Sequence, residues 1–280
     1  MQRNIKKYWP IFLLPTLVAF ILFFIAPFII GVYLSFCKFT TITDATFVGL
    51  INYTKIFTDA TFVHSLWFTA LFTIVTVIFI NVIGFAVAML LTKPIRGKNI
   101  FRTVFFMPNL IGGIILGYVW QLLLNGILMR WSRTLTYSEE YGFIGLVILM
   151  CWQQIGYMMV IYIAGIQNIP GDLIEAAQID GASKVQVLKK VILPMVMPSI
   201  TICTFLTVTN GFKLYDQNLA LTNGEPSKMT EMLAMNITNT FYGRTGYEGV
   251  GQAKAVIFFL MVGVIAVVQN KLTRSKEVQQ

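Results

Sequence analysis

The sequence has little charge, one histidine and three cysteines, and each scarcity narrows what the protein can do. Only 12% of its 280 residues are charged, whereas soluble domains carry about 25%. His64 is the single histidine; at the start of an apolar run it is expected to be an interfacial or packed residue. Cys37, Cys151 and Cys203 lie far apart in or beside apolar segments, which predicts small buried side chains rather than a disulfide framework or a metal site.

Catalytic and energy-coupling motifs are also missing. The sequence has no phosphate-binding P-loop, no zinc-binding pattern and no serine-nucleophile motif. Its apolar runs carry essentially no Asp, Glu, Lys or Arg, the residues that mark ion relays in transporters; the charges lie at the ends of the runs and in loops. We therefore expect a chain that is not an enzyme, neither hydrolyses nucleotide nor runs on an ion gradient, and takes energy for uphill transport from another subunit.

Long apolar runs are what the sequence has instead. Hydrophobic residues make up 56% of the chain and the mean hydropathy is +0.73. The runs are apolar on all sides, unlike the alternating strands of a membrane barrel. We predict an all-α integral membrane protein, a single domain over residues 1–280, with Pro15 and Pro27 kinking the first span. The six transmembrane helices are expected at residues 11–36, 63–91, 103–124, 143–166, 195–212 and 253–268.

Basic residues predict the orientation of these spans. With the N-terminus in the cytoplasm, the inside segments hold most of the 21 basic residues, including Lys93, Arg96, Lys98 and Arg102 in one short loop. Because cytoplasmic loops accumulate Lys and Arg, both termini are predicted to be cytoplasmic. The loop between spans four and five, at residues 170–194, is then cytoplasmic as well.

That loop has the pattern of two short helices joined by a bend. Asp172 is expected to cap the first helix, and Glu175 to lie in its first turn, where a carboxylate suits the positive end of the helix dipole. Ala176 and Ala177 are strong helix formers that leave a smooth face for close approach.

Gly181 allows the bend, and Ser183 and Gln186 have the spacing of a capping box that starts a second helix. Pro194 is expected to end that helix at the membrane, and Pro198 to kink span five. A rigid element between two spans suits mechanical coupling to a motor. An amphipathic loop that lies on anionic lipid is the alternative.

At these residues the chain resembles the permease subunits of type I binding-protein-dependent ABC importers. Their cytoplasmic motif is Glu-Ala-Ala, three residues, glycine, nine residues and Ile-x-Leu-Pro. Glu175-Ala176-Ala177, Gly181 and Leu193-Pro194 match at that spacing, with Val191 in place of the isoleucine. Asp180-Gly181-Ala182 resembles the carbohydrate branch in particular.

Other segments are similar to maltose-type permeases. Phe47–Tyr53 resembles the FVGLxNY of their first outside loop, and Phe101–Pro108 the entry to their next span. Phe212–Asp216 with Leu221–Pro226 resembles FKxFD followed by LTxGGP, with Glu225 in place of a glycine. The resemblance covers nearly the whole chain.

The resemblance implies six spans with a cytoplasmic coupling helix between spans four and five. The residues that would form the contact with a separate ATPase are Glu175, Ala176, Ala177, Asp180, Gly181, Ala182 and Pro194. A second homologous permease, two ATP-binding subunits and an extracellular solute-binding protein would complete an importer of a sugar or oligosaccharide in a bacterial plasma membrane. ATP and Mg would bind to the ATPase subunits; this chain would bind no cofactor, metal or nucleic acid.

A sugar path needs aromatic faces for ring surfaces and planar amides for hydroxyls. Aromatic and amide side chains in or near the spans are therefore candidates: Asn81, Trp120, Gln121, Asn125, Trp152, Gln153, Tyr157, Tyr162, Asn210 and Tyr215. The same residue types also serve as interfacial aromatics and as hydrogen bonds between helices. The G-x-x-x-G at Gly113 and Gly117 predicts a helix-packing face.

Other function classes stay open at this point. An importer of the same class could carry a polyol or a sugar phosphate, and the chain alone does not identify the solute. A self-sufficient secondary carrier is disfavoured by the missing buried charges, and a channel by the coupling loop. A membrane enzyme lacks any catalytic constellation.

Overall fold

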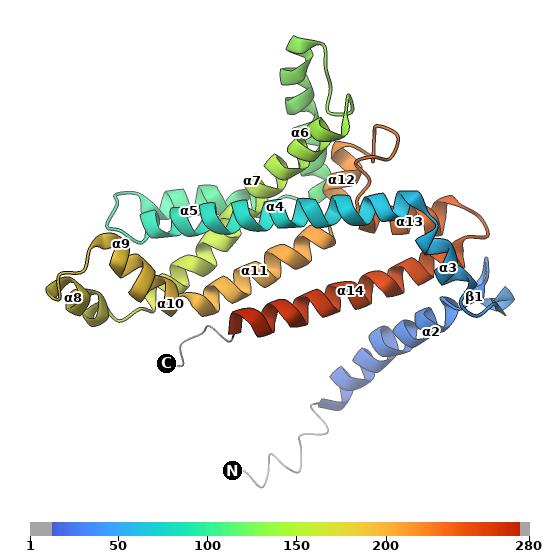
Figure 1. The fold of residues 1–280 in the computed structure, drawn as a ribbon, viewed down its shortest axis with the longest axis horizontal. Coiled ribbons are helices and arrows are strands. Elements are labelled where there is room, and N and C mark those ends of the chain that lie inside the picture. Colours follow the sequence, from blue (N-terminus) through green and yellow to red (C-terminus); the bar gives the residue numbers. More distant parts are fainter. Residues whose placement is uncertain (1–12, 275–280) are drawn as a thin grey trace, which may run out of the picture. The chain divides into compact units, whose positions relative to one another are not determined.

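A computed structural model describes residues 13–274 of the chain, and that range is almost entirely helical (Figure 1). The exception is a two-stranded antiparallel sheet of β1 (Cys37–Lys38) and β2 (Thr46–Phe47). Contacts divide the chain into two compact units, one of residues up to 60 with 237–260, the other of residues 61–236 with the chain from 261 onward. The single domain stays a prediction. Ile11, where the first span was expected to begin, and Arg3 lie outside the described residues.

Within the described residues, five helices are long and apolar enough to cross a membrane, and a bent pair of helices makes a sixth candidate. The six regions are Leu13–Leu34, α4 (Ala60–Leu91), Gly113–Trp131, α7 (Glu139–Gln167), the pair Lys184–Met195 with Met197–Phe212, and Glu248–Thr273. Each predicted span overlaps one of them. The prediction of an all-α membrane protein is confirmed.

The third span differs from its predicted bounds of 103–124. α5 (Lys98–Phe106) ends in a 3-10 turn, η3 (Met107–Leu110), and α6 (Gly113–Leu128) begins only at Gly113. Pro108 in η3 has no N–H with which to continue the α-helix, and Gly112 has an extended backbone, with φ −60° and ψ 141°. The apolar run is therefore two helices with a break, and the expectation of one continuous helix was wrong.

Wide π turns accommodate two of the prolines. The turn η1 (Ile21–Ile25) precedes Pro27 at the start of α2 (Ala26–Leu34), and η5 (Leu188–Ile192) precedes Pro194 in α10 (Leu193–Met195). In each turn the residue before the proline donates its N–H to the carbonyl five residues back, so the wide turn stands directly before the residue that has no N–H.

The helix therefore runs through Pro194 and ends at Met195, not at Pro194 as predicted. The chain then bends by 69° at the break before α11 (Met197–Phe212), which begins with Pro198 in its first turn.

The first unit packs the first predicted outside loop onto the start of α14 (Glu248–Arg274). Asn52, on α3 (Ile51–Phe57), is buried, and its Nδ2 donates hydrogen bonds to the carbonyls of Ser35 and Cys37 at 2.9 and 2.8 Å. Gly249 lies so close that an added Cβ would be 2.1 Å from the Cys37 carbonyl oxygen. Only glycine fits here. Cys37 is fully buried, as predicted.

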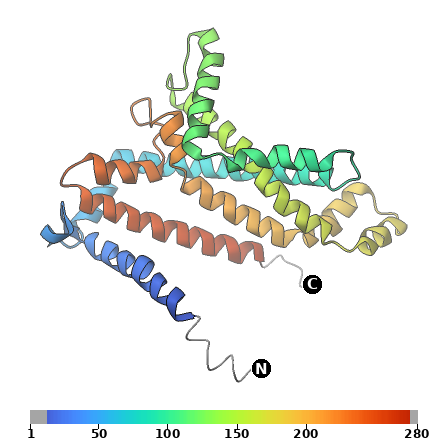
Figure 2. The same ribbon diagram turned by 180° about the vertical axis from the view of Figure 1, so that it is seen from behind.

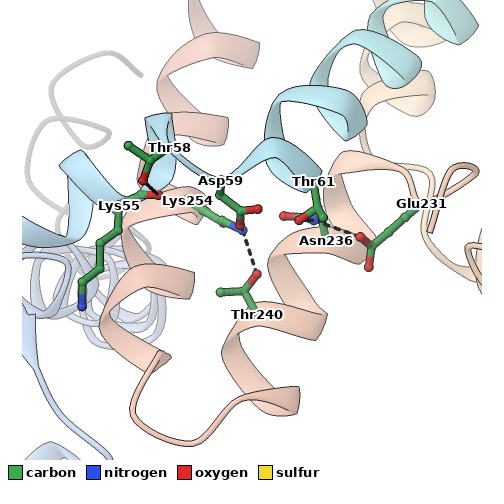
Figure 3. A network of polar contacts seen from close by, with 8 residues as sticks. All are labelled: Lys55, Thr58, Asp59, Thr61, Glu231, Asn236, Thr240 and Lys254. Atoms are coloured by element: carbon green, nitrogen blue, oxygen red, sulfur yellow. Dashed lines mark hydrogen bonds and ion pairs between the residues drawn. The ribbon is translucent and has the colours of Figure 1, made fainter. Parts of the chain in front are cut away.

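A buried ion pair also belongs to this unit. The Nζ of Lys254, on α14, lies 2.8 Å from Oδ2 of Asp59 and donates to Oγ1 of Thr240, on α13 (Leu233–Gly243), also at 2.8 Å (Figure 3). The Lys254 side chain is 0% exposed and that of Asp59 is 21% exposed. Because Lys254 falls within the predicted span 253–268, the expectation that the spans carry essentially no charge fails at this residue.

The core of the second unit lies among α4, α7 and α11. Its buried side chains include Phe72 and Ile80 on α4, Leu149 and Met158 on α7, and Cys203 on α11. Burial of Cys203 agrees with its prediction as a small apolar side chain.

Glycines let the helices of the second unit approach closely. An added Cβ at Gly156 of α7 would lie 1.8 Å from the carbonyl oxygen of Phe105 on α5. At Gly113 and Gly117 of α6, a Cβ would lie 2.8 and 2.7 Å from Cβ atoms on α12 (Asp216–Leu221). The predicted G-x-x-x-G packing face is confirmed.

Both ribbon views place the α4–α5 turn and the segment of α8 (Gly171–Ile179) and α9 (Lys184–Val187) at one end of the second unit (Figures 1 and 2). The basic loop from Lys93 to Arg102 and the 170–194 loop are thus on the same side. The predicted orientation, which puts both loops in the cytoplasm, requires this arrangement.

The α5–α7 contact makes a stability prediction. Gly156→Ala forces a Cβ into a peptide carbonyl and should lower the free energy of unfolding by about 3 kcal/mol or more. Gly126→Ala is the control, because Gly126 is also helical and nothing lies within 4 Å of its added Cβ; helix propensity predicts a change of about 1 kcal/mol at most, in the stabilising direction. Denaturation in detergent measures both, and equal effects would contradict the close approach.

The buried ion pair makes a second prediction. Asp59→Leu removes the carboxylate from a fully buried ammonium group and should destabilise by about 3–5 kcal/mol. Lys254→Met should cost less, because Asp59 retains some contact with solvent. The double variant should be more stable than the sum of the single changes predicts. Additive effects in the same denaturation assay would show that the pair does not interact.

Candidate functional site

The first helix of the 170–194 loop, α8, forms close to where it was predicted. It spans Gly171–Ile179, and its N-cap is Pro170, with no hydrogen bond from a capping side chain. Asp172 therefore lies in the first turn, and the prediction that it caps the helix was wrong. Glu175 lies in the second turn rather than the first. Pro170 has a non-helical ψ of 128°, and its carbonyl accepts a hydrogen bond from the N–H of Leu173 at 3.2 Å, so backbone rather than a side chain starts the helix.

The bend after α8 is closed by backbone hydrogen bonds. Gly181 has φ +78°, a left-handed conformation that glycine adopts at little cost. Its N–H bonds to the carbonyl of Gln178, and the N–H of Ala182 bonds to that of Ala177, each at 3.0 Å. These two bonds form a Schellman motif, which satisfies the last carbonyls of the helix. Gly181 is thus the bend that the sequence predicted.

The second helix begins with the predicted capping box. The Oγ of Ser183 accepts a hydrogen bond from the N–H of Gln186 at 3.3 Å, and Oε1 of Gln186 accepts one from the N–H of Ser183 at 2.7 Å. Helix end, bend and helix start are therefore bonded within ten consecutive residues, 177–186. The segment is preorganised without help from a partner.

The loop has a packed side and an exposed side. Ala177 and Ala182 are half-buried against the core, and Val187 is buried. A groove of about 330 Å³ runs between the two helices, lined by Asp180, Gly181, Lys190 and five neighbouring residues.

Glu175 and Ala176 are exposed. The exposed side of α8 therefore presents a carboxylate beside a small side chain. This arrangement suits insertion of α8 into a groove of a partner.

The amide candidates within the spans form bridges between helices. The Tyr162 hydroxyl on α7 donates to Oδ1 of Asn81 on α4 at 2.6 Å, and Nδ2 of Asn81 donates to Oγ1 of Thr207 on α11 at 3.1 Å. Tyr162 is 1% exposed. The three side chains join the three central helices of the second unit.

A second set of amides joins α7 to its neighbours. Gln153 accepts from Gln217 of α12 at 2.8 Å, and Gln154 accepts from Asn210 of α11 at 3.3 Å. Gln154, Gln217 and Thr207 had not been singled out from the sequence. Gln154 adjoins a candidate and Thr207 lies one turn before Asn210, so sequence spacing could have pointed to these two.

Two further candidate amides bond to backbone. Gln121 donates to the Leu221 carbonyl at 3.0 Å, and the Asn125 side-chain oxygen accepts from the N–H of Leu135 at 2.8 Å. Both side chains hold chain segments together, which was the alternative considered for them.

The aromatic candidates have more open surface. Trp120 of α6 and Trp152 of α7 meet edge-on, with ring centroids 5.5 Å apart, and Trp152 is 44% exposed. Tyr157 packs edge-on against Phe106, and Tyr215 directly precedes α12; both are half-buried. These four rings retain faces that another molecule can reach. Among residues 13–274, no group of three His, Cys, Asp or Glu side chains is placed to hold a metal ion.

Comparison with known proteins gives a consistent result. The model of the family described as "Binding-protein-dependent transport system inner membrane component" matches residues 80–276. A probable starch degradation products transport system permease protein of Thermoanaerobacterium thermosulfurigenes is 44% identical, covering 99% of this chain and 97% of the relative. A multiple sugar-binding transport system permease protein of Streptococcus mutans is 30% identical, with 99% of both chains covered.

Solved structures agree on the fold. A chain of a bacterial ABC transporter involved in the import of the acidic polysaccharide alginate superposes with a TM-score of 0.82 at 19% identity, covering 98% of both chains. A chain of the MetNI methionine ABC transporter gives 0.56 at 22% identity, covering 77% of this chain and 96% of the other.

The bend makes a prediction that does not depend on partners. Gly181→Ala places a side chain at φ +78° and should weaken the Schellman bonds by about 1 kcal/mol. The backbone amides of residues 181 and 182 should then exchange with solvent about fivefold faster. Gly171→Ala is the control, since Gly171 has open space and an ordinary φ. Hydrogen–deuterium exchange that is unchanged in Gly181→Ala would contradict the proposed role of the bend.

Proposed function

The chain belongs to the family of inner membrane components of binding-protein-dependent transport systems, and we propose that it forms half of the pathway through which an ATP-driven importer moves a sugar or oligosaccharide. The observation that carries the proposal is the exposed pair Glu175 and Ala176, next to the half-buried Ala177, on a loop that is closed by its own hydrogen bonds. The 44% identical relative, named for starch degradation products, supports the sugar class.

In this proposal the chain receives energy by contact with an ATPase subunit and does not bind nucleotide itself. ATP and Mg bind to two separate ATPase subunits, because this sequence has no P-loop. α8 sits in a groove of one such subunit, with Glu175 as its polar anchor and Ala176 allowing close approach. Closure of the ATPases then pushes on α8, and the Gly181 bend passes the displacement to α9.

The two ends of the loop carry the motion into the membrane. α8 follows directly on α7, and α9 leads through η5 and α10 into α11. The side-chain bridges Tyr162–Asn81–Thr207 and Gln154–Asn210 join α7 to α4 and α11. These bridges make the central helices move together, which is the rigid-body rocking that alternating access needs.

Three kinds of partner complete the importer: a second homologous permease, the two ATPase subunits, and an extracellular binding protein that delivers the solute. The assembly lies in a bacterial plasma membrane, with both termini of this chain in the cytoplasm. The basic α4–α5 turn and the α8–α9 segment lie at the same end of the second unit, which supports this orientation under the positive-inside rule.

Trp120, Trp152, Tyr157 and Tyr215 line the path in this proposal. Their half-buried or exposed rings offer the apolar faces on which sugar rings stack. The amide candidates set the positions of these helices, and Gln153 is held between α12 and the Ile111 carbonyl.

The coupling contact is tested with the whole importer in proteoliposomes. Glu175→Lys should lower ATPase stimulation by loaded binding protein, and sugar uptake with it, at least about tenfold, since a buried charge contact of this kind is worth about 2 kcal/mol or more. Glu175→Gln keeps the shape and should retain part of the activity.

Glu225→Lys is the matched control, because it reverses an exposed carboxylate on the predicted outer side. It should leave the ATPase response within about twofold of wild type. Full coupled activity in Glu175→Lys, with assembly intact, would refute the proposed contact. A wild-type importer that moves no sugar would refute the substrate class.

A further inference from the structure

A cavity opens between the N-terminal halves of α4 and α7, at the predicted outer side of the second unit. Its volume is about 410 Å³, within the usual range of small-molecule sites. α4 and α7 contribute apolar, aromatic and acidic side chains, among them Trp67, Phe68, Leu71, Glu139, Glu140 and Phe143. None of these residues is needed for the coupling contact.

The aromatic side of the cavity combines a packed phenylalanine pair with an exposed tryptophan. Phe68 is 2% exposed and meets Phe143 edge-on, with ring centroids 5.5 Å apart. Trp67, in contrast, is 71% exposed. A large aromatic face therefore stands open beside a rigid apolar surface, an arrangement that suits the C–H face of a sugar ring.

The acidic side of the cavity has two carboxylates, each with a polar side chain beside it. Nε2 of His64 lies 3.6 Å from Oε1 of Glu139 and 2.8 Å from the Met229 carbonyl oxygen. Oε2 of Glu140 accepts a hydrogen bond from Oγ of Ser138 at 2.5 Å. Each carboxylate keeps further lone pairs that can accept hydrogen bonds from hydroxyl groups.

We propose that this cavity is an entry subsite that holds one ring of a neutral oligosaccharide before it passes into the membrane. The ring stacks on Trp67, and its hydroxyls donate to Glu139 and Glu140. Two carboxylates repel uronate and phosphate groups, so the subsite selects against acidic sugars and anionic lipid headgroups. The inference rests on the proposed sugar-import function and adds a location and a charge preference to it.

The same end of the molecule provides a control for generic interfacial aromatics, which are common in membrane proteins. Trp131 is 66% exposed and lines a separate cavity of about 370 Å³ together with Leu128, Arg133 and Tyr141. The Arg133 guanidinium lies over the ring of Tyr141, 5.5 Å from its centroid. Trp131 thus matches Trp67 in type and exposure but faces a cation instead of two carboxylates.

Transport measured with Trp67 and Trp131 replaced one at a time distinguishes a sugar subsite from a generic interfacial aromatic. The probe is radiolabelled maltotriose, taken up by proteoliposomes that contain the whole importer at saturating binding protein. Trp67→Ala should lower the uptake rate about three- to tenfold, the value of one aromatic stacking contact. Trp67→Phe should restore most of it, and Trp131→Ala should leave uptake unchanged.

Several results would overturn the subsite. One is unchanged uptake in Trp67→Ala, and another is an equal loss in Trp131→Ala. A third is a loss in Trp67→Ala that follows weaker association of the binding protein, because the cavity would then be a protein-docking surface. If wild type itself imports no oligosaccharide, the proposed function fails; if wild type does and Trp67→Ala matches it, only the subsite fails.

The charge preference has its own test. Saturation-transfer NMR compares binding of maltotriose and of a galacturonic acid trisaccharide to the solubilised importer without binding protein. Glu140→Gln should shift the preference toward the acidic sugar about tenfold, whereas Asp44→Asn, which removes an exposed outer carboxylate elsewhere, should not. An unchanged ratio in Glu140→Gln would refute the acceptor role of this carboxylate.

Discussion

Each backbone N–H and C=O group that has no hydrogen-bond partner within a helix needs one elsewhere. This requirement shapes both the spans and the 170–194 loop. Along the helices, a wide π turn stands before Pro27 and before Pro194, and the helix continues through each proline. In the loop the solution is a Schellman bend at Gly181 followed by the Ser183–Gln186 capping box. Because the loop satisfies its own groups, it holds its shape before any partner binds.

Close contacts between helices hold the second unit together beyond the loop itself. Gly156 brings α7 against the backbone of α5, and Gly113 and Gly117 bring α6 against α12. At these short distances, side chains such as Tyr162, Asn81 and Thr207 bridge three helices directly. Amide side chains that the sequence offers as substrate candidates are thus engaged in holding the helices, while rings such as that of Trp152 stay exposed.

Much of this architecture could be predicted from the sequence, because apolar length identifies spans and fixed spacings identify caps. The two helices and the bend of the 170–194 loop, the G-x-x-x-G face and the Ser183 capping box were predicted for those reasons. The break at Gly112 was not, since hydropathy reports the length of an apolar run and not its direction. An end at Pro194 and a kink at Pro198 were predicted, but the structure has one bend of 69° between them, after Met195. The buried pair of Lys254 with Asp59 joins residues 195 positions apart, and no local pattern contains such a partner.

The central claim is that α8, the Gly181 bend, α9 and the following η5, which carries Lys189, move as one body. The most direct measurement is double electron–electron resonance between spin labels at Asp172→Cys and Lys189→Cys, in an assembled importer without its native cysteines. The account predicts one narrow distance distribution that stays the same with and without ATP, while the distance from residue 172 to the second permease changes. A distribution that shifts or broadens on ATP binding would contradict it.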